Sequence, residues 1–366
     1  MLCVTCFLSL EPTESFVQVF LPFRSNPVLR EEYISPQGRI RVGKALEDLD
    51  ALAGSVSYLH CSDADRELTI VTASVDRIDL IRDIPVDRDI SIVGQVTYVG
   101  SSSMEVSIRM MRLPDEKLSR TAILEAKFIM VARDPATGKA ATVPQLLLET
   151  DEDRARFRAG TEHKARKQFA AQTALTKRAP SVEEMSLVHS LYLEYRQYAH
   201  QRDDNPMETA QSIVPKPHSI EFMGDTRLQN ITLTFPQDRN MHGKIFGGWL
   251  MRLAFELGYA TGSLFAQAPL HFLSLDDITF RRPVEIGAIL DLSSQVCYTM
   301  DKKIVVKVVA HVLEPESGSK ELSNEFWFTF EAAPKNVSLY EPRRIMPRSY
   351  NDCMLYIEGR RRIVST

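Results

Sequence analysis

Cysteine, positive charge and long apolar runs are all scarce in this sequence, and each shortage excludes a class of protein. The five cysteines, at positions 3, 6, 61, 297 and 353, are odd in number and scattered. This pattern argues against a disulfide framework and favours a reducing compartment. Cys3 and Cys6 form a single C-x-x-C without a second pair, so no metal site is predicted.

The charge balance and the apolar segments exclude two further classes. A net charge of -4 gives no general attraction to nucleic acid, so no nucleic-acid partner is expected. No stretch approaches the roughly 20 apolar residues that span a bilayer. The segment before Arg24 contains no Lys or Arg, unlike a signal peptide or an Arg-rich transit peptide. We therefore expect a soluble protein without a membrane span.

The chain contains a long internal repeat. With a shift of 200 residues, SVDRIDL (74–80) aligns with SLDDITF (274–280), and QVTY (95–98) aligns with QVCY (295–298). The correspondence continues without a gap to Ala132 and Ala332. A period this long indicates a duplicated domain, because stacked repeats have periods of about 20 to 50 residues.

Each copy has the same order of elements: a strand, a loop, one long helix and several strands. Helical spacing of apolar residues predicts the helices over 43–60 and 243–266. One helix for each run of β-branched strands predicts an α+β fold, an antiparallel sheet wrapped around a central helix. The predicted divisions are a first domain (12–150), a charged helical linker (151–218), a second domain (219–335) and a C-terminal tail (336–366).

Glycines crowd the start of the second predicted helix. The pattern Asn-x-x-Gly-x-x-x-Gly-Gly (240–248) and the segment DDITFRRPVEIGAILDLSSQVCYT (276–299) resemble the double-hotdog acyl-CoA thioesterases over nearly the whole chain. The resemblance is closest to the branch usually found in mitochondria. It implies a tandem hotdog fold and hydrolysis of fatty acyl-CoA. Coenzyme A is then part of the substrate and no retained cofactor is expected.

The resemblance also implies an assembly and a location. Members of this family form homo-oligomers of double hotdogs, so self-association is expected. A mitochondrial location follows from the family alone, with the cytoplasm as the alternative.

The resemblance implies one composite active site, in which a loop asparagine of one fold meets a helix carboxylate of the other. Asn240 matches the asparagine. The carboxylate stands seven residues after the last glycine of the helix entrance. Counting from Gly43 reaches Asp50, whereas counting from Gly248 reaches Phe255.

The first copy lacks the other half of this pair. Three residues before Gly38, the equivalent of Gly243, stands Ser35 instead of an asparagine. One site per chain is therefore expected, built from Asp50 and Asn240, and the Ser35/Phe255 counterpart is expected to be inactive.

Thioester hydrolysis suits these residue types. Asp50 is the candidate general base, with a nucleophilic role through an anhydride as the alternative. Asn240 would orient the water or the thioester. Backbone N–H groups around Gly247 and Gly248 would stabilise the oxyanion at a helix N-terminus. His242 could assist, since imidazole titrates near neutrality.

Simpler interpretations stand beside these roles. Asp50 could be a solvated helix acid, Asn240 a turn residue and His242 a structural histidine. Asp276 and Asp277 could be paired carboxylates or a metal site, but Asp76 matches Asp276 under the shift, which favours a structural role. Arg252 and Glu256 are four residues apart and are expected to pair with each other. Coenzyme A phosphates could meet the linker bases or the tail run, namely Arg154, Arg156, Arg158, Lys164, Arg166, Lys167 and Arg360 to Arg362.

Two other functions compete with hydrolysis. Decay of one site is compatible with a non-catalytic acyl-CoA sensor or scaffold. A hotdog hydratase or dehydratase would use an aspartate and a histidine about five residues apart. The segment DRNMH (238–242) places them four apart and before the helix, so this alternative is less favoured.

Overall fold

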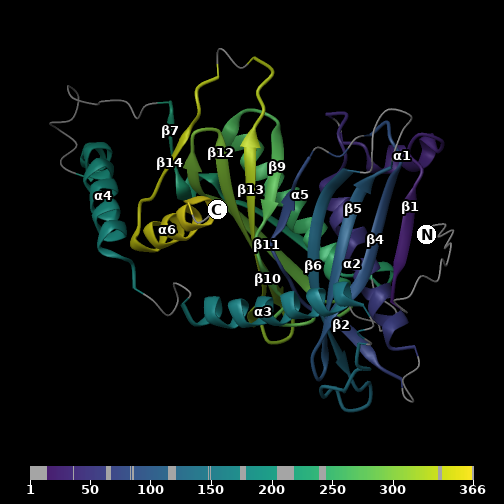
Figure 1. Ribbon diagram of the computed structural model, residues 1–366. Helices are drawn as coiled ribbons and strands as arrows, with labels where there is room; N and C mark the ends of the chain where they lie inside the picture. Colours follow the sequence, from purple (N-terminus) through teal and green to yellow (C-terminus); the bar gives the residue numbers. More distant parts are fainter. Residues whose placement is uncertain are drawn as a thin grey trace.

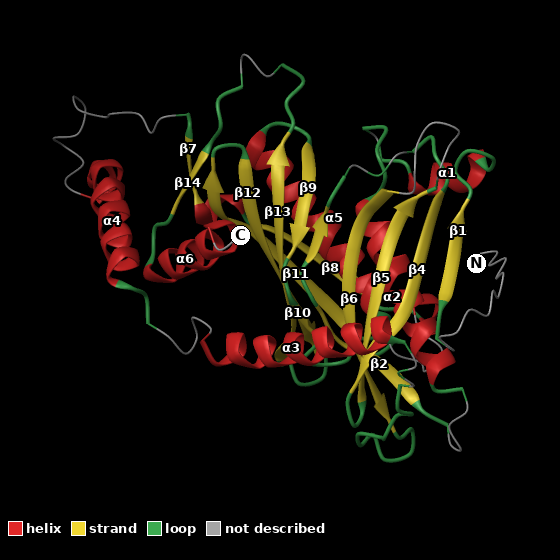
Figure 2. Cartoon of the chain, viewed as in Figure 1, coloured by secondary structure: helices red, strands yellow, loops and turns green. Residues whose placement is uncertain are grey.

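The chain folds into two similar halves that stand side by side. The computed structural model describes residues 15–35, 37–62, 67–82, 84, 86–113, 121–146, 148, 150–173, 179–203, 218–238, 245–336 and 340–364. Each half consists of an antiparallel sheet against one long helix (Figures 1 and 2). This arrangement confirms the predicted α+β double hotdog.

The elements follow the predicted order in both halves. The first half contains β1 (Val17–Leu21), α1 (Pro27–Tyr33), α2 (Val42–His60), β2 (Thr69–Val75), β3 (Ile78–Leu80), β4 (Ile90–Val99), β5 (Ser103–Arg112) and β6 (Thr121–Arg133). The second half contains β7 (Ile220–Phe222), β8 (Leu228–Leu233), α5 (Gly247–Ala266), β9 (Leu270–Leu275), β10 (Ile278–Thr279), β11 (Ile289–Met300), β12 (Lys303–Leu313) and β13 (Lys320–Ala332). Between the halves lie α3 (Asp151–Thr173) and α4 (Val182–Asp203), and the chain ends with β14 (Arg344–Met346) and α6 (Tyr350–Val364).

The sheets of the two halves are joined into one. Strand β3 pairs with β9, placing Ile78 opposite Leu275, and β10 pairs with β2, placing Ile278 opposite Val75. The residues paired at one junction are the repeat equivalents of those paired at the other, with the two halves interchanged. The halves are therefore related by an approximate twofold axis. This continuity holds the halves in one register and fixes where side chains from one half can reach the other.

The two long helices α2 and α5 pack against each other on one face of this sheet (Figure 1). Their contact begins at equivalent glycines, Gly43 and Gly248. A methyl group added at Gly248 would lie 2.8 Å from the Cα atom of Glu47, and one at Gly43 would lie 3.1 Å from Cγ of Arg252. Close helix approach therefore explains why both helices begin with glycine.

The ion pairs of these helices cross between the halves. Arg252 lies 3.4 Å from Glu47, and Arg41 lies 2.9 Å from Glu256. The predicted pair between Arg252 and Glu256 is therefore wrong. The helix contact offers each side chain a partner on the opposite helix, and this contact is not visible from spacing within one helix.

Helices α3 and α6 occupy equivalent places, with an offset of 199 residues. Each begins with a capping box, formed by Thr150 with Asp153 and by Ser349 with Asp352. Each then packs an aromatic ring against a tyrosine of the sheet. Between ring centroids, Phe157 lies 5.0 Å from Tyr98 and Tyr356 lies 4.9 Å from Tyr298. We therefore group α3 with the first half and α6 with the second, instead of with a linker and a tail.

Among the described residues, no helix combines the length and the apolar content required to cross a bilayer.

Candidate active site

Asp50 of α2 reaches from the first half to the second. Its side chain is 1% exposed. One carboxylate oxygen accepts a hydrogen bond from the Thr72 hydroxyl at 2.8 Å, and the other accepts one from the backbone N–H of Gly248 at 2.6 Å. Gly248 lies in the first turn of α5, where backbone N–H groups lack helical partners. The carboxylate is thus positioned by residues of both halves, which excludes the interpretation of Asp50 as a solvated helix acid.

Burial changes the acidity of this carboxyl group. Desolvation raises the pKa of Asp50 to about 6, although the hydrogen bonds from Thr72 and Gly248 act in the opposite direction. A carboxyl group with this pKa is ionised at neutral pH and is still basic enough to accept a proton. This is the property required of a general base.

A second buried carboxyl group, that of Asp48, lies two residues before Asp50 on the same helix. The Tyr33 hydroxyl donates to Asp48 at 2.6 Å, and burial raises the pKa of Asp48 to about 6. Asp48 bonds within the first half, whereas Asp50 bonds to the second. The two carboxyl groups therefore have similar pKa values but bond to different halves of the molecule.

The glycines at the start of α5 lie against Asp50. A methyl group added at Gly247 would be 3.0 Å from the Asp50 carboxylate and 3.2 Å from the ring of Phe280. The N–H of Gly248 is engaged by Asp50 in this structure. Stabilisation of an oxyanion by Gly247 and Gly248 stays a prediction, and their small size is explained in part by these neighbours.

Asn240 and His242 lie outside the described residues, in the segment 239–244. Residue Ile245, which follows this segment, donates its N–H to the carbonyl of Val284, and α5 begins two residues later. In the sequence, Asn240 and His242 therefore precede the helix end that Asp50 contacts. The roles of Asn240 and His242 stay predictions.

The equivalent place in the second half is apolar. Phe255 stands where the first half has Asp50, and Phe272 of β9 stands where it has Thr72. Their rings meet edge to face with centroids 5.5 Å apart, and Phe328 and Phe330 also contact Phe255. No described carboxylate or hydroxyl side chain takes the place of the Asp50–Thr72 pair there.

Ser35, the counterpart of Asn240, takes part in a local turn. Its hydroxyl accepts a hydrogen bond from the N–H of Arg39 at 3.2 Å. The hydroxyl is thus used within its own loop. Together with Phe255, this supports the expectation that the counterpart site is inactive.

Thr72 was missed by the sequence reasoning. The shift of 200 residues aligns Thr72 with Phe272, just as the helix entrances align Asp50 with Phe255. A search for polar residues whose repeat partners are aromatic would have found both members of the pair.

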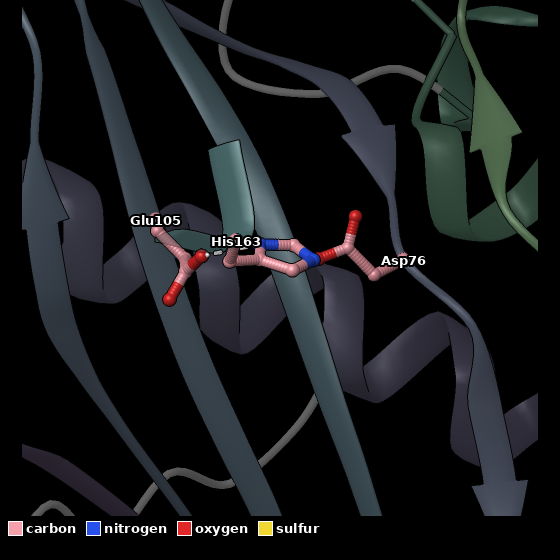
Figure 3. A group of neighbouring side chains, drawn as sticks. All are labelled: Asp76, Glu105 and His163. Atoms are coloured by element: carbon pink, nitrogen blue, oxygen red, sulfur yellow. Dashed lines mark hydrogen bonds and ion pairs between the residues drawn. The ribbon is translucent and has the colours of Figure 1, made fainter. Parts of the chain in front are cut away.

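Three titratable side chains form a cluster on the face of the sheet covered by α3. His163 of α3 lies between two carboxylates, with Nδ1 2.9 Å from Glu105 and Nε2 3.2 Å from Asp76 (Figure 3). The two ring nitrogens face different carboxylates, so one ion could not bind the ring and both acids in this arrangement. Lys127 and Thr97 also contact Glu105. The cluster attaches α3 to the sheet.

The second half has an equivalent attachment. Arg362 of α6, aligned with His163, forms an ion pair with Asp276 and lies over the ring of Trp327. Asp76 and Asp276 therefore both hold a helix onto the sheet, which confirms their predicted structural role.

Several of the predicted phosphate-binding bases have partners within the chain. Arg361 pairs with Glu184, and Arg362 pairs with Asp276. Arg154 pairs with Asp151 in its own helix. A role for these bases in binding coenzyme A phosphates stays untested.

The described cysteines do not suit catalysis. Cys61, Cys297 and Cys353 are buried free thiols, and burial raises the pKa of Cys297 to about 12. Cys3 and Cys6 lie outside the described residues.

Comparisons with known proteins identify the family that this chain is similar to. Residues 43–119 match the family described as the thioesterase superfamily. The chain is 38% identical over 357 residues to acyl-coenzyme A thioesterase 9, mitochondrial, of Mus musculus, covering 96% of this chain and 78% of that protein. It is 37% identical over 366 residues to acyl-coenzyme A thioesterase 2, chloroplastic, of Humulus lupulus, covering 96% and 80%.

A solved structure extends the fold comparison. A putative oleoyl thioesterase from Lactobacillus plantarum superposes with a TM-score of 0.52 at 12% identity, covering 87% of this chain and 96% of that one. At this identity the likeness shows the fold alone.

Proposed function

We propose that this chain, which belongs to the acyl-coenzyme A thioesterase family, hydrolyses fatty acyl-CoA to a free fatty acid and coenzyme A. One observation carries the proposal within the molecule. The buried Asp50 carboxylate bonds to Gly248 in the first turn of the other half's helix, and Asn240 precedes Gly248 by eight residues in the sequence. Each chain then has one composite site.

In this proposal Asp50 acts as the general base. An ionised carboxylate has about four acceptor positions, so the bonds from Thr72 and Gly248 leave room for a water molecule. The carboxylate would take a proton from that water as it attacks the thioester carbonyl. Asn240 would orient the water or the thioester through its amide.

The start of α5 would receive the negative charge of the tetrahedral intermediate. Backbone N–H groups and the positive end of the helix dipole stabilise negative charge at this position. Because the Gly248 N–H bonds to Asp50, this role would fall to the other backbone N–H groups of the first turn. The leaving thiolate departs as coenzyme A.

The proposal extends to the location and the assembly of the protein. The relative from Mus musculus is named as mitochondrial, whereas the one from Humulus lupulus is named as chloroplastic. We propose a mitochondrial location for this chain, with the cytoplasm as the alternative. We also propose that it assembles into a homo-oligomer of double hotdogs.

The deciding experiment measures thiol release from acyl-CoA substrates of increasing chain length. We expect turnover by the wild-type protein, and loss of turnover with retained binding in Asp50→Asn and Asn240→Ala. If the wild-type protein binds acyl-CoA but releases no thiol, a non-catalytic sensor becomes the better account. Hydration of enoyl-CoA without thiol release would instead support a hydratase.

A further inference from the structure

The ring of Phe280 lies beside the Asp50 carboxylate at the start of α5, and the ring of Phe246 lies against Gly248 in the same turn. The ring of Phe280 and the carboxylate approach the same point beside Gly247, at 3.2 and 3.0 Å from an added methyl group. The ring of Phe246 lies 2.8 Å from the equivalent point at Gly248. Both side chains are partly buried, so part of each ring is accessible.

The backbone fixes the position of Phe280. Its N–H donates to the carbonyl of Ala73 at 2.9 Å, continuing the pairing between β10 and β2. Ala73 directly follows Thr72, which bonds to Asp50. The ring, the hydroxyl and the carboxylate are thus held by one hydrogen-bonded junction between the halves.

The repeat shows that this arrangement is specific to one site. Under the 205-residue offset that aligns Asp50 with Phe255, Phe246 aligns with Arg41, and under the 200-residue offset that aligns Thr72 with Phe272, Phe280 aligns with Leu80. The Asp50 site therefore has a polar inner pair from the first half and aromatic outer residues from the second. The counterpart site has an aromatic inner pair from the second half, Phe255 and Phe272, and its outer residues from the first half are a cation and an aliphatic side chain.

From this inversion we infer that Phe280 is a specificity-determining residue, whose ring forms the wall against which the first carbons of the acyl group lie. The inference rests on the proposed hydrolysis at Asp50. A water activated by this carboxylate must lie about 3 to 3.5 Å from the thioester carbon. The substituents of that carbon are then next to the ring. An apolar ring suits the acyl side, because the thiol side of the substrate continues into a chain with polar amides.

A ring at this position restricts branching next to the carbonyl. A methyl branch on the first acyl carbon would compete for the space that the ring occupies, whereas a straight chain would lie along it. The wild-type protein should therefore hydrolyse butyryl-CoA faster than isobutyryl-CoA, its branched isomer. Removing the ring should reduce this discrimination.

The test compares kcat/KM for these two substrates in Phe280→Ala and in the matched control Leu80→Ala. We expect the ratio of isobutyryl-CoA to butyryl-CoA activity to rise about tenfold in Phe280→Ala, within the range that one methyl group in a pocket produces. The ratio should stay within about twofold of wild type in Leu80→Ala. Phe280→Leu introduces the residue found at the equivalent position of the other half, Leu80. It provides a second measurement of the activity ratio if the alanine variant folds poorly.

Asp50→Asn, assayed in parallel, distinguishes a failure of the role of Phe280 from a failure of the proposed function. If Asp50→Asn is inactive but Phe280→Ala and Phe280→Leu leave the ratio unchanged, the role of Phe280 is refuted and the proposed function stands. An equal change in Leu80→Ala would also overturn the inference. If Asp50→Asn keeps full activity, the proposed site itself fails.

Discussion

The two halves share a fold but differ at the position that faces the partner helix. In the first half, Asp50 bonds to Thr72 and to the second half's helix. In the second half, Phe255 packs against Phe272 with no hydrogen bond required. Both positions of the pair, Asp50–Thr72 in one half and Phe255–Phe272 in the other, therefore differ together. This is expected, because a buried carboxylate without a hydrogen-bond partner, or a hydroxyl left among aromatic rings, is destabilising.

The centre of the helix contact differs in the same way. Glu47 and Arg252 occupy equivalent positions of the repeat and pair with each other across the contact. Two identical halves would bring like charges together at this point. Joining the copies in one chain therefore allows complementary charges and a division of roles, in which one half supplies the carboxylate and the other supplies the helix end.

The largest expected difference between the halves is in turnover. Asp50→Asn should lower kcat by about 10² to 10⁴, the range for loss of a general base. Phe255→Leu should leave kcat within about twofold and lower the free energy of unfolding by about 1 kcal/mol, because it disturbs a well-packed aromatic cluster. Thiol-release kinetics and denaturant unfolding measure the two effects. A loss of turnover in folded Phe255→Leu would show that both places are needed.

The pH dependence should separate the two acidic residues of α2. With the pKa of Asp50 near 6, activity should fall about tenfold per pH unit below pH 6. Asp48→Asn, which can still accept the Tyr33 hydroxyl bond, should keep this profile although the pKa of Asp48 is also about 6. If the Asp48 variant loses the acidic limb, the assignment of the limb to Asp50 is incorrect.

Stability should change with pH in the opposite direction to activity. Because the folded state raises the pKa of Asp50, it binds more protons than the unfolded state between about pH 4 and 6. The contribution of this group is most favourable at low pH, and about 3 kcal/mol is lost as pH rises through 6. Asp50→Asn should unfold at a higher temperature than wild type at pH 8. An equal or lower Tm at pH 8 would argue against a buried, ionised carboxylate.

The two entrance glycines should respond unequally to the same substitution. In Gly248→Ala the new methyl group would lie 2.8 Å from a backbone atom of Glu47, which cannot move without separating the helices. In Gly43→Ala the nearest atom, at 3.1 Å, belongs to the flexible side chain of Arg252. We expect a rate loss of about tenfold or more and 1 to 3 kcal/mol of destabilisation for Gly248→Ala, and a smaller effect for Gly43→Ala. Equal effects would mean that the Asp50 contact does not depend on this approach.

The sequence predicted the fold well because its periodic features are local. Apolar spacing located α2 and the second half's helix, and β-branched runs located the strands. Asp50 was found because its distance from Gly43 is counted along one helix. Contacts between elements could not be read in this way, so the pair of Arg252 with Glu47 was missed.

The equivalence of α3 and α6 was also missed, for a different reason. The repeat offset changes from 205 residues at the helices to 200 at the strands and 199 at α3 and α6, so a gap-free alignment loses them. The charged composition of residues 151–173 then favoured a linker. The shared features, such as Gly160 against Tyr98 and Gly359 against Tyr298, depend on packing across the sheet.

The smallest expected effect concerns the ion pair at the centre of the helix contact. Glu47 and Arg252 are about a fifth to a quarter exposed, so solvent screens their attraction. A double-mutant cycle with Glu47→Gln and Arg252→Gln should give a coupling energy of about 0.5 to 1 kcal/mol in the free energy of unfolding. The same cycle on the more exposed Arg41 and Glu256 pair should give less. If neither pair shows coupling, the charge difference between the halves serves only to avoid repulsion, and the fit of the helices rests on their glycines alone.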